Sequence, residues 1–129
     1  MIVVQLQGGL GNQMFQYAAG LRLAIKHRQM LKWDLTALLD RSPRPDFVYR
    51  EYDLKMFNLP NSPASKAELR KFRRICEPGT RSILERIADK VTRRCYFREQ
   101  TLFFDSNVLE LPNDTYLEGY SNIKPIFGM

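Results

Sequence analysis

The sequence predicts an α/β fold with a mostly parallel sheet and flanking helices, formed by a single domain over residues 1–129. A short run rich in β-branched residues, "IVVQLQ", precedes three glycines in four positions, and an apolar pattern with helical spacing follows them. A second strand-like run, "MLKWD" (30–34), completes a strand–helix–strand unit, which is the usual beginning of a parallel sheet. A hydrophobic content of 44% is enough for one core in a chain of 129 residues.

The strand–helix unit is expected to have the following bounds. The first strand covers residues 2–7, which end at glycine. The helix begins at Asn12, a residue type that favours helix N-caps. Its buried face is expected to carry the apolar residues at spacings of four, three and four, namely Met14, Ala18, Leu21 and Ile25. Basic residues 26–28 then crowd its last turn, where positive charge complements the helix dipole.

The rest of the chain mixes loop, helix and strand signals. The proline-containing stretch 41–63 reads mostly as loop, and "YREYDLKMFNLP" within it is either an edge strand or one turn of helix. Ser65 and Glu68 form a capping box that predicts a helix over "SKAELRKFRRI". Pro78–Gly79 should end it, and "TRSILERIADKVTRR" predicts another helix. Strand-like text returns in "CYFRE", "TLFFDSNVLEL" and "TYLEGY", the last after a Pro112–Asn113 turn.

The net charge of +6 and the pI of about 9.5 indicate an anionic partner without choosing among nucleotide, nucleic acid and acidic lipid. Residues 66–98 hold eleven Lys or Arg against four Asp or Glu. We interpret these charges as the solvent faces of two helices rather than a nucleic-acid site, because no aromatic residues interleave them. Two cysteines without a CxxC pattern, and no run resembling a signal peptide or membrane span, predict a cytoplasmic protein, with peripheral membrane contact left open.

The glycine-rich turn is the strongest functional signal. A helix N-terminus leaves backbone N–H groups unpaired and carries about half a positive charge, so it attracts phosphate. Glycines before it let the backbone approach a ligand closely. Gly8, Gly9 and Gly11 meet this need, Asn12 is the expected cap, and Gln13 adds a carboxamide at the mouth of the turn.

Other site classes fit less well. The dinucleotide fingerprint G-x-G-x-x-G uses Gly9 and Gly11 but meets Met14 at its third position, where a bulky side chain opposes close helix–strand packing. Asp34, 23 residues past Gly11, is either a ribose-binding acid or a strand-end turn residue. There is no P-loop GKS or GKT. The one histidine, His27, has no partners for a catalytic triad or a His/Cys metal site.

The stretch "GGLGNQMFQYAAGLRLA" resembles the N-terminal signature of glycosyltransferase family 11, the α-1,2-fucosyltransferases, and most of all their bacterial members. The segment "YDLKMFNL" (52–59) is similar to the family's Y-x-L-x-x-F-x-I/L segment. Residues 103–127 resemble the stretch that ends in a "GYWQSEKYF"-type sequence in relatives. The resemblance therefore covers nearly the whole chain.

This resemblance implies a GT-B enzyme with two Rossmann-like domains, of which this chain would be the N-terminal half. Such an enzyme moves L-fucose from GDP-fucose to the 2-hydroxyl of a terminal β-galactoside, with inversion and with no metal or cofactor. Carried over by position, Gly9, Gly11, Asn12 and Gln13 would bind the donor, with Asn12 ranked first.

The sequence also departs from the family. The H-x-R-R-x-D motif, whose arginines grip the diphosphate, is absent, since Arg93–Arg94 lack its histidine and aspartate. Ser121 replaces the usual aromatic residue, and Pro125 breaks the usual text. We therefore expect a truncated form with at best about millimolar affinity for GDP-fucose, no turnover without a second domain, and self-association through an exposed interdomain surface.

The catalytic base and the function class stay open at this point. Asp34, Asp53 and Glu118 are chemically suited to be the base, and none is nominated. The alternatives to a transferase are a non-catalytic module that binds glycan or a protein partner, a small nicotinamide-dependent protein, and a nucleic-acid binder that uses residues 66–98.

Overall fold

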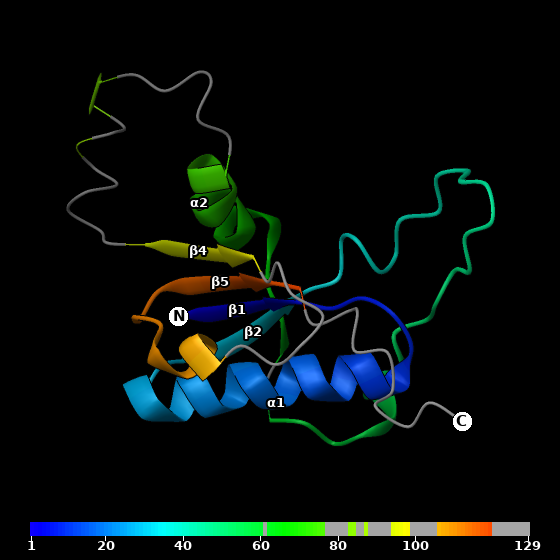
Figure 1. Cartoon of the computed structure of the whole chain (residues 1–129), viewed down its shortest axis with the longest axis horizontal. Coiled ribbons are helices and arrows are strands. Elements are labelled where there is room, and N and C mark those ends of the chain that lie inside the picture. The colour runs from blue at the N-terminus through cyan, green and yellow to red at the C-terminus, as the bar shows by residue number, and fades with distance from the viewer. Residues whose placement is uncertain (61, 77–82, 85–86, 88–93, 99–105, 120–129) are drawn as a thin grey trace.

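The computed structural model describes residues 1–60, 62–76, 83–84, 87, 94–98 and 106–119 (Figure 1). In this part of the chain an all-parallel five-stranded sheet has the order β3-β2-β1-β5-β4. The strands are β1 (Ile2–Gln5), β2 (Leu31–Asp34), β3 (Ser62–Pro63), β4 (Cys95–Arg98) and β5 (Thr115–Glu118). The helices are α1 (Leu10–His27) and α2 (Lys66–Cys76), with 3₁₀ turns η1 (Asp53–Met56) and η3 (Ser106–Glu110). The predicted α/β class with a parallel sheet is confirmed.

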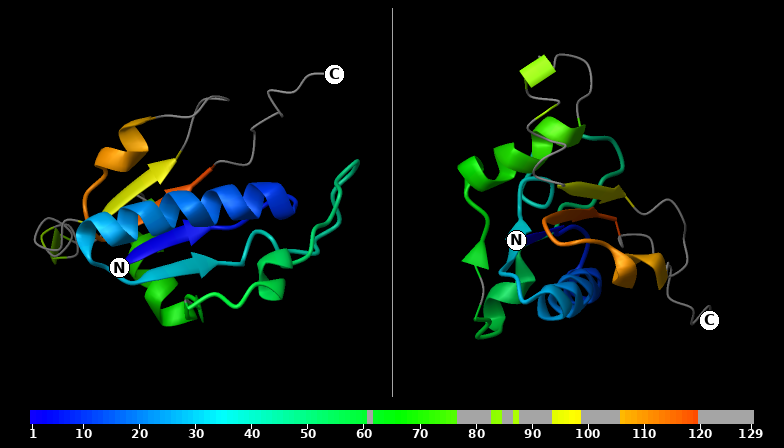
Figure 2. Two further views of the ribbon diagram at one scale, coloured as in Figure 1. Left: turned by 90° about the horizontal axis from the view of Figure 1, so that it is seen from below. Right: turned by 90° about the vertical axis from the view of Figure 1, so that its left-hand side faces the viewer.

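The sheet lies between the two helices, with α1 on one face and α2 on the other (Figures 1 and 2). Successive residues of β1 point to opposite faces, so Ile2 and Val4 pack in the core on the α1 side. Val3 packs with Leu69 and Phe72 of α2. Because both faces are covered, β1 is a continuous apolar run rather than an alternating one.

Helix α1 begins two residues earlier than predicted, at Leu10, and Asn12 is not its cap. Gly9 is the N-cap residue, with extended backbone and no side-chain cap bond. Gly8, at φ +79°, turns the chain, and the Asn12 side chain packs against it: a Cβ on Gly8 would lie 2.5 Å from Asn12 Nδ2. The two glycines complete the turn, so the helix starts directly after them.

The predicted buried face of α1 is wrong. Met14 is 47% exposed and Ile25 is 66% exposed, whereas the buried residues are Gln13, Gln16, Gly20, Leu23 and Ala24. Gly20 permits the close approach of α1 to the sheet, because a Cβ there would lie 2.4 Å from Val4 Cγ2. Met14 points away from the sheet, so its bulk does not oppose the packing as the sequence argument assumed.

Several shorter predictions are decided as well. Strand β1 ends two residues before the predicted end, and 52–59 contains a single helical turn, η1. The capping box of α2 is confirmed: the Ser65 N–H donates to Glu68 Oε2 (2.7 Å) and the Glu68 N–H donates to Ser65 Oγ (3.2 Å). The edge strand β3 has only two residues, with Pro63 beside Trp33 of β2.

Residues 106–110 form η3 rather than the expected strand. The turn buries Val108 in the core on the α1 side, and Lys26 Nζ at the end of α1 donates to the Leu109 carbonyl (2.7 Å). Pro78–Gly79, most of the helix expected over 80–94, and the departures at Ser121 and Pro125 lie outside the described residues.

Candidate functional site

Two cavities lie near the carboxyl ends of the strands, the edge at which open α/β sheets bind ligands. The first, the turn cavity, has a volume of about 380 Å³. Residues that line it include Gly8, Gly9, Asn12, Arg44, Phe47 and Arg50. The second, the sheet-edge cavity, has a volume of about 600 Å³. Residues that line it include Gln5, Asp34, Phe72, Tyr96, Tyr116 and Glu118.

The structure brings two of the four predicted donor-binding residues, Gly9 and Asn12, to the turn cavity. Gly11 does not line it, and a Cβ on Gly11 would meet no atom within 4 Å. The backbone N–H groups of Leu10 and Gly11 have no hydrogen-bond acceptor among the described residues. The first turn of α1 therefore keeps the unpaired donors that an anion could bind.

Gln13 does not stand at the mouth of the turn, contrary to the sequence prediction. Its side chain is fully buried, and Nε2 donates to the carbonyls of Gly8 (2.9 Å) and Glu51 (2.8 Å). Its Oε1 accepts from the Asp53 N–H at 3.0 Å. The carboxamide is thus used within the chain, where it holds the glycine turn against the segment that leads into η1. Sequence patterns could not reveal this role, because two of the partners lie 38 and 40 residues away.

Gln16 is a second buried glutamine that the sequence reasoning missed. Its Oε1 accepts from the Gln7 N–H (3.0 Å), and Nε2 donates to the carbonyls of Gln7 (3.2 Å) and Gly119 (3.3 Å). Gln16 therefore joins the chain just after β1 to the chain just after β5. The two strand ends that border the cavities are held together by one side chain.

Two arginines at the turn cavity were also missed. A Cβ on Gly9 would lie 3.8 Å from Arg50 Nη1, so the Arg50 guanidinium lies over the glycine turn. Within the described residues this guanidinium has no hydrogen-bond or ion-pair partner. Arg44 lies over the Phe47 ring, 3.8 Å from its centroid, with Nη2 3.7 Å from Asp40 Oδ2. Periodicity could not find them, because the loop that carries them has no regular structure. They place positive charge at the turn cavity.

The three carboxylates named as chemically suited bases lie in different surroundings. Asp34 is buried; its Oδ1 accepts from the Thr36 N–H (2.8 Å) and its Oδ2 accepts from the Tyr116 hydroxyl (2.7 Å). It is a strand-end turn residue, and both oxygens are occupied. Asp53 lies in the first turn of η1. Glu118 ends β5 in the sheet-edge cavity, where burial raises the pKa of its carboxyl group.

Among the described residues, no group of three His, Cys, Asp or Glu side chains is placed to hold a metal ion. No helix in the described parts of the chain has the length and apolar character needed to cross a membrane. Comparison of the chain with family models, with curated proteins and with solved structures gives no match.

Proposed function

We propose that this chain is the N-terminal, Rossmann-like half of a GT-B glycosyltransferase related to family 11, and that it contributes to the transfer of L-fucose from GDP-fucose to the 2-hydroxyl of a terminal β-galactoside. The observation that carries the proposal is the turn cavity. There the signature "GGLGNQMF" meets the Arg50 guanidinium and a helix N-terminus at the ligand-binding edge of a parallel sheet.

The turn cavity suits the diphosphate of an activated sugar. Arg50 and Arg44 line the cavity and supply charge-assisted donors. The unpaired amides of Leu10 and Gly11 do not line it, but they lie in the sequence between the lining residues Gly9 and Asn12 and are the neutral donors of the proposal. Two or three such bonds at about 1.5–3 kcal/mol each, with about 1 kcal/mol from the helix end, are offset by several kcal/mol of ordering and association costs. The expected affinity of the chain for GDP-fucose is therefore about millimolar.

Exposed apolar side chains near the same edge support the assignment to half of a two-domain enzyme. Met14 and Phe15 of α1 are each 47% exposed, and Phe47 and Val48, in the loop that carries Arg44 and Arg50, are 45% and 65% exposed. Apolar surface of this kind is typical of faces that another domain or protein covers. The family's arginine motif would come from that second domain.

A nucleotide titration tests the proposal. We expect GDP to shift the backbone amide resonances of residues 9–11 in NMR spectra, with a dissociation constant near 1 mM. Arg50→Ala should weaken binding about tenfold or more, because it removes one charge-assisted bond of about 1.5 kcal/mol or more. Arg22→Ala, on the exposed middle of α1, is the matched control and should leave the constant unchanged.

Three results would contradict the proposal: no shift at the turn with 10 mM GDP (~10 times the expected constant), an equal loss in both arginine variants, or preferential binding of NADH. Turnover of GDP-fucose with a β-galactoside is expected only when a second domain with the H-x-R-R-x-D motif is supplied in trans. Glycan binding without nucleotide binding would instead favour the non-catalytic module.

A further inference from the structure

The sheet-edge cavity is built differently from the turn cavity. It lies on the α2 side of the sheet, and its wall joins aromatic rings from three elements: Phe72 of α2, Tyr96 of β4 and Tyr116 of β5. Tyr96 and Tyr116 are stacked, with centroids 5.6 Å apart and planes 20° apart. The ring centroids of Phe72 and Tyr116 are 6.0 Å apart. The three rings form one continuous apolar wall.

This wall is fixed before any ligand arrives. The Tyr116 hydroxyl donates to Asp34 Oδ2, and Asp34 is itself held by the Thr36 N–H and hydroxyl. Tyr116 and Phe72 are 6% and 2% exposed, so packing holds both rings, while Tyr96 is half-buried and is the ring that a ligand can reach. A preformed wall reduces the ordering cost of binding.

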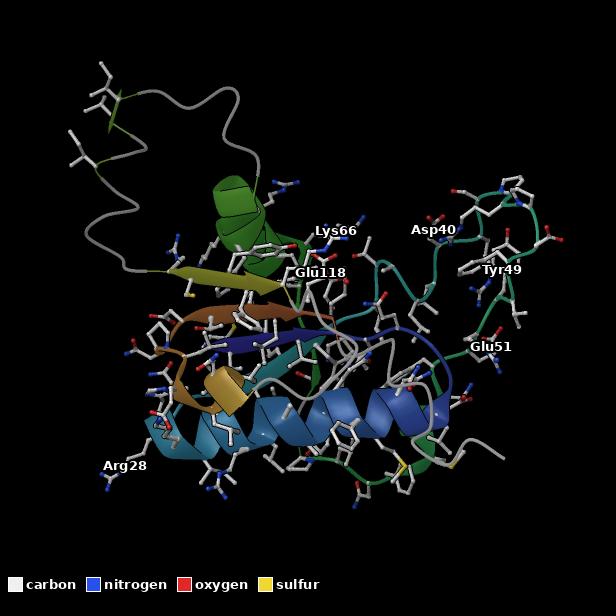
Figure 3. All side chains as sticks on the ribbon, in the orientation of Figure 1. Arg28, Asp40, Tyr49, Glu51, Lys66 and Glu118 are labelled. Carbon is white, nitrogen blue, oxygen red and sulfur yellow. The ribbon has the colours of Figure 1, made fainter. Side chains whose placement is uncertain are left out.

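The polar side chains beside the wall come from neighbouring strands. Glu118 ends β5 and Gln5 ends β1, and both line the cavity; Figure 3 labels Glu118 near the ends of the strands. Among the described residues, the charge partner of Glu118 is Arg98, whose Nε lies 3.7 Å from Glu118 Oε1. The Gln5 carboxamide has no hydrogen-bond partner among the described residues. The Glu118 carboxylate, a strong hydrogen-bond acceptor, and the Gln5 carboxamide, which can donate and accept, therefore line the same cavity as the aromatic rings.

The charge around the cavity selects against anions. The carboxylate of Asp34 is occupied by its hydrogen bonds, and that of Asp40 accepts from the Ser42 N–H and hydroxyl with Arg44 nearby. Arg98 opposes Glu118. An anion would meet the carboxylates of Glu118, Asp34 and Asp40, because hydrogen bonds from neutral donors engage a carboxylate without cancelling its charge. A cation would meet the guanidinium groups of Arg44 and Arg98, which lie beside Asp40 and Glu118.

We propose that the sheet-edge cavity binds a neutral sugar ring, with the C–H face of the ring on Tyr96 and a ring hydroxyl donating to Glu118. An aromatic ring offers apolar area to the C–H face, while a carboxylate accepts strongly from hydroxyl groups. The cavity volume of about 600 Å³ lies within the range of small-molecule sites and leaves room for more than one sugar unit. The choice of a β-galactoside as the first probe rests on the proposed function, in which this ring belongs to the acceptor.

Saturation-transfer NMR and titration of the full chain with methyl β-D-galactoside test this inference. We expect a dissociation constant near 1 mM, weakened about fivefold or more by Tyr96→Leu and by Glu118→Gln. Tyr96→Leu keeps an apolar side chain and removes the aromatic face, and Glu118→Gln keeps the shape and removes the charge. Arg50→Ala should leave sugar binding unchanged while it weakens GDP binding.

The outcomes separate this site from the proposed function. Binding of another neutral methyl glycoside but not of the galactoside, with the same response to the two variants, supports the sugar site and contradicts the assigned acceptor. Sugar binding that is retained when GDP fails to bind supports the site and contradicts the proposed function. No binding of any neutral glycoside, preferential binding of a quaternary amine, or unchanged affinity in Glu118→Gln would overturn the inference.

Unfolding curves of each variant show whether a loss of binding reflects a loss of the fold. Glu118→Gln should be at least as stable as the parent at pH 7, because burial disfavours the charged form of the Glu118 carboxyl group.

Discussion

Replacement of Gln13 by alanine separates a structural role from a ligand-binding role at the glycine turn. The buried carboxamide makes three hydrogen bonds, to the carbonyls of Gly8 and Glu51 and from the Asp53 N–H. Each contributes about 0.5–1.5 kcal/mol, and the backbone groups left behind lose these partners. We expect Gln13→Ala to lower the free energy of unfolding by about 3 kcal/mol, within a range of about 2–5. A chain of this size should then lose about 10 °C in melting temperature.

The assay is urea unfolding followed by the fluorescence of Trp33, the one tryptophan of the chain, which lies in the core on the α1 side. Arg50→Ala serves as the opposite case, because its exposed guanidinium should affect GDP binding and change stability by less than about 0.5 kcal/mol. If Gln13→Ala leaves the unfolding midpoint unchanged and weakens GDP binding, Gln13 does not hold the glycine turn in place. The sequence prediction that Gln13 contacts the ligand would then be right.

Two further predictions concern stability. Gly20→Ala should destabilise the fold by about 1–2 kcal/mol, since overpacking against Val4 costs about 1–3 kcal/mol and alanine returns up to about 1 kcal/mol of helix propensity. Gly11→Ala in the same helix, where a Cβ meets nothing within 4 Å, should be neutral or stabilising, and chemical unfolding of both variants compares them; equal effects would contradict the packing argument. The pKa of Glu68 is about 2, below its ordinary value of 4.5, mainly because its carboxylate accepts a hydrogen bond from the Ser65 backbone N–H. The resulting stability should be complete above about pH 4.5 and lost as the pH falls toward 2, and Glu68→Gln should flatten that part of the pH profile; an unchanged profile would show that Glu68 does not titrate as described.

The local features of the fold could be predicted from the sequence because their causes are local. β-Branched residues beside glycine marked β1, and a serine three residues before a glutamate marked the start of α2. The buried face of α1 could not be predicted in this way. Apolar periodicity favoured Met14 and Ile25, whereas the sheet packs on a face that holds two glutamines and Gly20. Those glutamines can be buried only because distant backbone groups satisfy them.

The candidate site shows the same division. The glycine turn is a feature of consecutive residues, and Gly9 and Asn12 were found from them. Arg50 reaches the turn only through the path of a loop without regular structure, and the aromatic wall joins residues of three elements between positions 72 and 116. Contacts between residues so far apart in the sequence depend on the strand order and the path of the loops, which neither periodicity nor spacing reveals.

The two-residue strand β3 limits how the sheet can grow. A free sheet border offers a row of backbone donors and acceptors to any extended chain, and this is a common route to aggregation. At β3 that row is very short, and Pro63 has no N–H to give. A strand added from another molecule would find a fuller border at β4, which spans four residues and ends in Arg98. The border beside β2 is thereby protected by a single proline, and replacing it with valine would remove that protection.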